Sequence, residues 1–523
     1  MALDKSVLVD MPEHGTVLRK VSGKTYVYYA TAVYRNEKGQ PTADRTSIGR
    51  YDEESGKLIP NRNYYEVYLK TDAPNNKAYY SCGVEIATKA ISEKTGLKRY
   101  LKMYFPENYR EILTAAQYML CCGNVMQYID DYTQETKTAV NKVMTNQQCS
   151  RLFESIREED ILLFLKDWLK RKKDREFIAY DVTSISSYAK NIPETEWGYN
   201  RDKEKLPQIN MGMYYGEESG LPLYYRIYPG SISDKAHLKY MISDNDFIKA
   251  KNMSFVMDRG FYSADNLKYL TDKGCRFVMA LPGGLKYCSD LIEKYRNEIV
   301  NHSQYLLGKG LPYAKSIEFT EFDFRMNIHI YYDPEKALQE SEALTELIER
   351  QENDLKSMEE PPDRKLRYDK YFYINRTKDG KLAFKKNYKA IDEQLNKCGF
   401  FLIAETDFKH TSKEILEIYR TRNRIESSFD NLKNELDMKR LHTQTSQTMT
   451  GKIFCSFIAL IFRSYMSKHL SESSETASLT FKKVIIELSK LKCFDFNPKI
   501  KPQLINPPTK LQRTILLSLD CMC

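Results

Sequence analysis

The stretch EFIAYDVTSIS, residues 176–186, decides the fold of this chain, because it is an apolar, β-branched segment that predicts a buried strand ending in a single acid, Asp181. Two more strand-like stretches follow, LPQINMGMYYG (206–216) and LPLYYRIYPG (221–230), and the turn GEESG joins them. The pattern then alternates: a short helix, the strand MSFVMDRGF (253–261), a helix that stops at a glycine, and the strand CRFVMALP (275–282). A meander of three strands followed by βαβ units predicts an α/β fold with a mixed sheet.

This order of elements is that of a ribonuclease H-like core. Residues 285–397 interrupt it with strand-like and helical segments, among them the acidic helix EKALQESEALTELIERQENDLKSMEE, which we expect to be solvent-exposed. The core resumes with GFFLIAETD and a long helix, TSKEILEIYRTRNRIESSFDNLKNEL. The fold class predicted is therefore a ribonuclease H-like mixed sheet core interrupted by a β-containing insertion.

Outside the core, the sequence predicts an N-terminal β module and a helical segment. We expect the following division: 1–80, an antiparallel β module; 81–175, a helical region that binds DNA or links; 176–284 and 398–470, the catalytic domain; 285–397, the insertion; 471–523, a basic C-terminal region. The β module either lies on DNA or is a plain packing module. The basic residues that favour DNA contact are Arg19, Lys20, Lys24, Arg35, Lys38, Arg45 and Arg50. The basic run 170–173 is typical of a solvated helix face.

Composition limits the classes of protein to which this chain can belong, but it does not indicate a function. Lys plus Arg number 80 against 71 Asp plus Glu, which gives a formal charge of +9 and leans towards an anionic partner. The eleven cysteines are scattered without zinc spacing, which indicates reduced thiols in a cytoplasm. The N-terminus is polar, and the most apolar stretch, 453–466, is too short to span a bilayer, so we expect a core helix there and no membrane.

Two acids follow apolar strands, Asp181 after FIAY and Asp258 after SFVM. Functional groups of α/β sheets gather at the carboxyl ends of strands, and adjacent strands lie about 4.8 Å apart. Two aspartates at neighbouring strand ends can therefore share metal ions, and Mg²⁺ prefers oxygen ligands. Taken singly, either aspartate is more often the cap of a turn or helix.

The helix after Thr411 supplies a third acid. Tyr419, Arg422, Glu426 and Lys433 are separated by offsets of 3, 4 and 7, which places them on one edge of a regular helix beside its apolar face. Charged side chains next to a core are costly unless they are paired or bind a ligand. The alternative is an ordinary Arg422–Glu426 salt bridge at i,i+4.

The spacing Tyr419-x2-Arg422-x3-Glu426-x6-Lys433 resembles the YREK signature of bacterial insertion-sequence DDE transposases of the insertion-sequence-four superfamily. DVTS at 181–184 is similar to the first-aspartate motif of that family, and DRGF at 258–261 to the second. The stretches 196–210 and 216–234 also resemble the family. The resemblance spans about residues 177–465.

The resemblance implies a ribonuclease H-like enzyme that binds two Mg²⁺ or Mn²⁺ ions per active site. Asp181, Asp258 and Glu426 would be the catalytic metal ligands. The residues that would contact DNA phosphates are Tyr419, Arg422 and Lys433, with Arg259 as a lesser candidate. The enzyme would cleave double-stranded DNA at the terminal inverted repeats of an insertion sequence and transfer the strand into target DNA. It would act as a homodimer on DNA ends, in the bacterial cytoplasm at the nucleoid.

One departure concerns tryptophan. Better-studied members of the family place a tryptophan in the insertion, whereas Trp168 and Trp197 of this chain lie outside it. Whether the reaction passes through a DNA hairpin intermediate is therefore left open by the sequence. Two related alternatives are a nuclease of the same fold that does not join strands, and an inactive transposase-derived DNA-binding protein. A carboxylate-pair hydrolase such as a glycosidase would use two acids without the basic stripe, and metal dependence would separate it.

Overall fold

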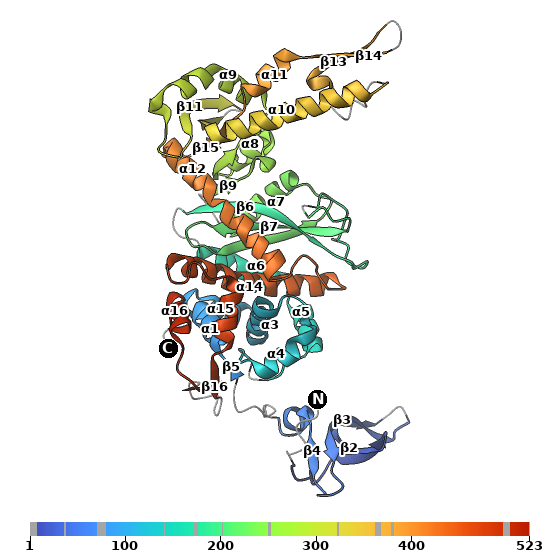
Figure 1. The fold of residues 1–523 in the computed structure, drawn as a ribbon. Helices are drawn as coiled ribbons and strands as arrows, with labels where there is room; N and C mark the ends of the chain where they lie inside the picture. Colours follow the sequence, from blue (N-terminus) through green and yellow to red (C-terminus); the bar gives the residue numbers. More distant parts are fainter. Residues whose placement is uncertain are drawn as a thin grey trace. The chain divides into compact units, whose positions relative to one another are not determined.

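The computed structural model describes residues 8–35, 38–70, 80–140, 142–171, 176–200, 202–248, 253–321, 324–360, 368–377, 381–494 and 503–521. Figure 1 shows the order of its elements. The chain forms two compact units. Unit 1 comprises Met1–Phe164, Asn431–Met438 and His442–Cys523, and unit 2 comprises Leu165–Asp430 and Lys439–Leu441. The five-part division drawn from the sequence is finer than this and stays a prediction.

Unit 2 is built on an eight-stranded sheet of order β11-β12-β15-β10-β9-β6-β7-β8. Three of its strands form the expected antiparallel meander: β6 (Phe177–Ser186), β7 (Gln208–Gly216) and β8 (Pro222–Pro229). Strand β6 also pairs in parallel with β9 (Ser254–Met257), which pairs in parallel with β10 (Arg276–Ala280). The order β8-β7-β6-β9-β10 is the ribonuclease H-like arrangement, so the predicted fold class is confirmed.

Helices cover both faces of this sheet. On one face, Tyr180 approaches His237 of α7 (Asp234–Ile248), with 3.5 Å between the Tyr180 hydroxyl and Nδ1. On the other face, Val256 and Val278 pack with Ile415 of α12 (Ser412–Thr421). Side chains of a strand alternate between faces, so Asp181 points to the face that α12 covers. Helix α8 (Ala264–Asp272) connects β9 to β10.

The insertion extends the core sheet instead of standing apart from it. Strands β11 (Tyr313–Glu321) and β12 (Phe324–Tyr332) join the sheet through β15 (Phe400–Glu405), which is antiparallel to both β12 and β10. The remaining elements of the insertion are α9 (Lys286–Asn301), α10 (Pro334–Ser357), β13 (Phe372–Arg376), β14 (Leu382–Lys386) and α11 (Tyr388–Leu395).

The acidic helix α10 differs from the expectation of a solvent-exposed helix. Leu344, Ile348 and Leu355 are buried along one side and form a small core with the β13–β14 hairpin and α11. The spacing of these residues is that of an amphipathic helix, so the acids occupy only its outer face. Asp333 caps the helix by accepting hydrogen bonds from the backbone N–H groups of Glu335 and Lys336.

Unit 1 begins with the predicted antiparallel β module. Strands β1 (Thr16–Val21), β2 (Lys24–Arg35), β3 (Pro41–Tyr51) and β4 (Leu58–Pro60) pair in chain order around a small core. The helices that follow are α1 (Gly83–Lys94), α2 (Leu97–Tyr104), α3 (Tyr109–Cys122), α4 (Ile129–Glu135), α5 (Asn146–Ser155) and α6 (Glu158–Trp168), the last of which crosses into unit 2.

The centre of unit 1 is α14 (Ser446–Glu472), whose residues from 449 to 466 are almost all buried. It packs against α3 and α5, as expected for a core helix. The C-terminal region is folded and contains α15 (Phe481–Ser489), α16 (Lys510–Ser518) and two strands, β16 (Lys492–Phe494) and β17 (Gln503–Leu504). Strand β16 pairs with β17 on one side and with β5 (Tyr80–Ser81) on the other. Among the described residues, no helix is long and apolar enough to cross a membrane.

Candidate active site

Asp181 and Asp258 lie side by side at the centre of the sheet. Asp258 directly follows β9, as predicted, whereas Asp181 lies in the middle of β6 and not at its end, because β6 continues to Ser186 in its pairing with β7. The parallel register pairs Ala179 with Val256, so two residues further on Asp181 stands opposite Asp258. Paired residues of neighbouring strands share a face, with strands about 4.8 Å apart. Asp181 is 4% exposed and Asp258 is half-buried, which leaves one side of the pair open to solvent.

The third-acid helix is broken into three segments, which differs from the single regular helix predicted. Helix α12 ends at Thr421, α13 (Asn423–Asp430) carries Glu426, and a π-helical turn (Asn431–Glu435) carries Lys433. The offset of 7 between Glu426 and Lys433 therefore does not place them on one straight stripe. Lys433 is 7% exposed and belongs to unit 1, and its contact with DNA stays a prediction.

Five of the seven predicted site residues meet around the Arg422 guanidinium. Its Nη1 atom lies 2.7 Å from Glu426 Oε1, and its carbon lies 5.6 Å from the centre of the Tyr419 ring. The Tyr419 hydroxyl donates a hydrogen bond of 3.2 Å to Asp258 Oδ1. Burial pushes the pKa of Arg422 down, but four neighbours outweigh it and raise the pKa: the Tyr419 hydroxyl and the carboxylates of Asp258, Glu426 and Asp181. All three acids thus act on one cation.

Arg259, the lesser DNA-contact candidate, lies next to this group. It begins a short 3₁₀ turn after β9, and its backbone N–H donates to Asp258 Oδ1 at 2.8 Å. Its side chain is exposed. The backbone contact orients the Asp258 carboxylate, whereas the guanidinium is free to extend towards a partner.

The donor set fits a hard divalent cation by its chemistry. Three carboxylates supply oxygen ligands of the kind that Mg²⁺ and Mn²⁺ prefer. No group of three or more His, Cys, Asp or Glu side chains among the described residues is arranged to hold a metal ion. In the structure, Arg422 engages Glu426 and Tyr419 engages Asp258, so a site for metal requires Glu426 to exchange its arginine partner for the cation.

We predict that Tyr419→Phe lowers the rate of DNA cleavage by about fivefold, because one hydrogen bond is lost and such a bond is worth about 1 kcal/mol. Burial, followed by the charge of Asp258, raises the pKa of Tyr419 to about 12, so the neutral hydroxyl orients the carboxylate over the whole working pH range. Single-turnover cleavage rates test this. Tyr332→Phe on β12 is the control, and an equal loss there would contradict a specific role for Tyr419.

Two buried carboxylates that sequence analysis missed lie where β6 begins. Glu176 Oε2 accepts hydrogen bonds from the backbone N–H groups of Glu218 (3.1 Å) and Ser219 (2.8 Å). Glu217 is 5% exposed, and its carboxylate lies 4.0 Å from Nη1 of Arg424, which also donates to the Glu217 backbone carbonyl. Arg424 therefore attaches α13, the helix of Glu426, to the sheet. Glu217 sits in the GEESG turn (216–220), whose composition is typical of a solvent-exposed turn, and Glu176 directly precedes β6.

Glu217 makes the stability of unit 2 depend on pH. Burial raises the pKa of Glu217 to about 8 from an ordinary value of 4.5, so the folded state favours the neutral form. The stability that this provides is complete below about pH 4.5 and is lost as pH rises through 8. We expect Glu217→Gln to melt about 5 °C or more above the wild-type protein at pH 8.5 and to match it at pH 4.5. Glu218→Gln, which is exposed, is the control, and a pH-independent difference would contradict this assignment.

The two tryptophans have different environments. Trp168 is fully buried, and its Nε1 donates to the Pro222 carbonyl at 2.9 Å, so it is a core residue. Trp197 is 66% exposed in the segment between β6 and β7. Only Trp197 is accessible to a partner.

The topology of the sheet assigns the protein to a structural class, that of proteins with a ribonuclease H-like core. The family model described as "Transposase DDE domain" matches residues 172–462, more than half of the chain, and the chain belongs to this family. The family implies an enzyme of the polynucleotidyl transferase or nuclease kind with DNA as its partner, and its members generally use divalent metal ions.

Among solved structures, the chain is similar to a piggyBac transposase in a synaptic complex with hairpin DNA. The identity is 10% and the TM-score 0.37, over 78% of this chain and 76% of the other, a likeness too weak to carry an argument. No curated protein matches the chain in sequence.

Proposed function

We propose that this chain is an insertion-sequence transposase of the YREK type that cleaves DNA at the ends of its element and joins them to target DNA. The observation that carries the proposal is the convergence of Asp181, Asp258 and Glu426 on Arg422 at the open side of the ribonuclease H-like sheet. Such a concentration of carboxylates at the centre of a sheet is costly unless it serves a cation.

The three acids would hold two Mg²⁺ or Mn²⁺ ions, which when bound supply Lewis acidity at the scissile phosphate. Asp181 and Asp258 come from rigid strands, so they give the site a fixed base. Glu426 is on a helix next to a break and half-exposed, so it can adjust. Tyr419 orients Asp258, and Arg422 is close enough to turn from Glu426 to a phosphate oxygen.

The remaining contacts belong to the same proposal. Arg259 and Lys433 would bind DNA phosphates away from the scissile bond. The partners would be the terminal inverted repeats of the element and target DNA, held by a homodimer. A nuclease without strand joining uses the same three acids, so the reaction products must distinguish the two enzymes.

The test uses the full chain, linear DNA that carries the ends of its element, and a supercoiled target plasmid. We expect cleavage at the ends in Mg²⁺ or Mn²⁺, no cleavage with chelator, and end–plasmid joint molecules. Cleavage without joint molecules would leave the nuclease as the function. Binding to the ends without cleavage in either metal would support an inactive DNA-binding descendant.

The open face of the β module is a candidate surface for binding the element's ends. Cross-strand register places Arg19, Tyr26 and Arg50 in one row across three strands. Val27, which is fully buried, faces the module's core, so its neighbour Tyr26 faces the opposite side. Arg19 also lies 5.3 Å over the Tyr28 ring. Arginine interleaved with tyrosine suits contact with DNA phosphates and sugars.

We expect the triple replacement of Arg19, Lys24 and Arg50 by alanine to weaken binding of the element's ends steeply at low salt. Each phosphate contact contributes about 0.9 to the slope of log K against log salt, so the slope should fall by about 3. Binding titrations at several salt concentrations measure it. A charge-matched control replaces Lys94, Lys98 and Lys102 together by alanine. An equal loss of binding in the control would show that net charge, and not this face of the β module, determines the binding.

A further inference from the structure

A hollow of about 550 Å³ in unit 1 is lined without a single carboxylate. Its lining comes from three segments of chain: Val125, Met126, Gln127, Asn146, Gln147, Ser150, Phe153, His442, Thr443, Gln444, Thr445, Thr448 and Lys452. We call it the Lys452 hollow. Its only residues that can carry charge are a lysine and a histidine, both of which can be positive.

Two helices begin at this hollow. Helix α5 starts after the N-cap Thr145, and its first residues Asn146 and Gln147 line the hollow. Helix α14 starts after the N-cap Thr445, whose side chain accepts from the Thr448 backbone N–H at 3.2 Å. The N-terminus of a helix carries about half a positive charge and presents backbone N–H groups. Two such ends at one hollow favour an anion.

Two buried polar side chains line the same hollow. Lys452 is 2% exposed, and its Nζ atom reaches only Asn124 Oδ1, at 3.4 Å, among the hydrogen-bond partners found in the described ranges. Burial lowers the pKa of Lys452 to about 8, although the charge of Asp437 acts in the opposite direction. Thr443 is 8% exposed, and its hydroxyl oxygen finds no hydrogen-bond partner in the part of the chain that the structure describes. The Thr443 hydroxyl therefore lacks the partner that burial demands, and the Lys452 ammonium, which has three donors, has one long hydrogen bond.

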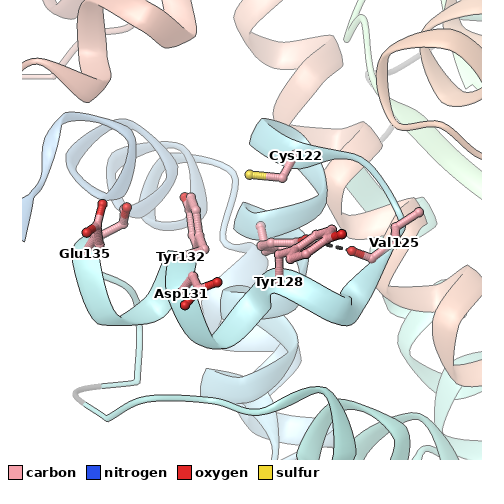
Figure 2. A pocket seen from close by; sticks show the side chains of 8 residues that line it. Cys122, Val125, Tyr128, Asp131, Tyr132 and Glu135 are labelled. Carbon is pink, nitrogen blue, oxygen red and sulfur yellow. Dashed lines mark hydrogen bonds between the residues drawn. The ribbon is translucent and has the colours of Figure 1, made fainter.

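A neighbouring hollow shows that this lining is not general in unit 1. A second hollow, of about 520 Å³, lies at α3 and α4, where Tyr118 donates to the Val125 carbonyl at 2.6 Å. Figure 2 shows the side chains that line it. Its lining contains Asp131 and Glu135 and no cation. That hollow repels anions, whereas the Lys452 hollow attracts them.

We propose that the Lys452 hollow binds a phosphate group, and that in the proposed function, on which this inference rests, the phosphate belongs to the DNA backbone. The helix ends, the Lys452 ammonium and the Thr443 hydroxyl supply the donors.

The test measures binding of inorganic phosphate and of element-end DNA to the full chain, both without divalent metal. We expect Lys452→Met to weaken phosphate binding at least about tenfold and Thr443→Val about threefold, because charged hydrogen bonds are stronger than neutral ones. The salt slope for DNA should fall by about 1 in Lys452→Met. Lys468→Met and Thr450→Val, on the same helix outside the lining, are the matched controls. Melting curves verify that each variant is folded.

Each outcome decides one point. Unchanged phosphate binding in both variants overturns the site. Weakened phosphate binding with an unchanged DNA slope overturns the DNA backbone as the source and leaves a site for free phosphate. If the wild-type chain binds phosphate through Lys452 but neither binds nor cleaves its ends, the proposed function fails while the site stands.

Discussion

Replacing Asp181 by asparagine, Asp258 by asparagine or Glu426 by glutamine is expected to lower DNA-end cleavage by about three orders of magnitude or more. Each change removes one anionic oxygen donor from a set of three, and metal stabilisation of the transition state is worth several kcal/mol. The folded state should persist, because the substitutions keep size and hydrogen-bonding shape. They also relieve repulsion between Asp181 and Asp258, which face each other across neighbouring strands.

The measurement is single-turnover cleavage with melting curves on the same samples. Glu417→Gln on α12 and Asp265→Asn on α8 are exposed controls of matched chemistry, and we expect both to cleave normally. A variant of the three acids that retains more than a tenth of wild-type cleavage would remove that residue from the metal site. Binding of DNA ends should stay within about twofold, because phosphate contacts with cations supply most of it.

Arg422 is expected to give the second-largest effect. Arg422→Lys should lower cleavage about tenfold and Arg422→Met about a hundredfold, because lysine keeps the charge but cannot reproduce the forked contact with a phosphate. The Arg422 side chain is 13% exposed and lies among all three acids, and the proposed function puts the scissile phosphate there.

The competing hypothesis is that Arg422 only holds Glu426 in an i,i+4 salt bridge, which the 2.7 Å contact also permits. Melting curves separate the two. Cleavage lost with normal melting supports phosphate contact, whereas melting lowered in proportion to cleavage would establish the salt bridge as the role. Arg420→Lys, on the exposed side of α12, is the matched control and should change neither quantity.

Several features of the site are predictable from local sequence. The strand of Asp181 and the strand of Asp258 are apolar runs of the right length, and a meander followed by βαβ connections leaves few ways to order them. Parallel neighbours then bring Asp181 and Asp258 to one level of the sheet. The spacing of Tyr419, Arg422 and Glu426 likewise keeps each within about one turn of the next, even across the break at residue 422.

The sequence alone therefore determined the strand order, the two aspartates on neighbouring strands and the helix that brings the third acid, because each depends on contacts between residues close in the chain or on a short list of allowed connections. Tertiary structure decided the rest. It broke the third-acid helix and buried Lys433, and it paired β11–β12 with the core sheet. Tertiary packing also buried Glu217, although it lies in a turn whose composition is typical of solvent-exposed segments. The same packing brought segments near residues 125, 146 and 442 together around Lys452 to form one hollow. Burial and long-range packing depend on what the rest of the chain places nearby, and no local pattern carries that information.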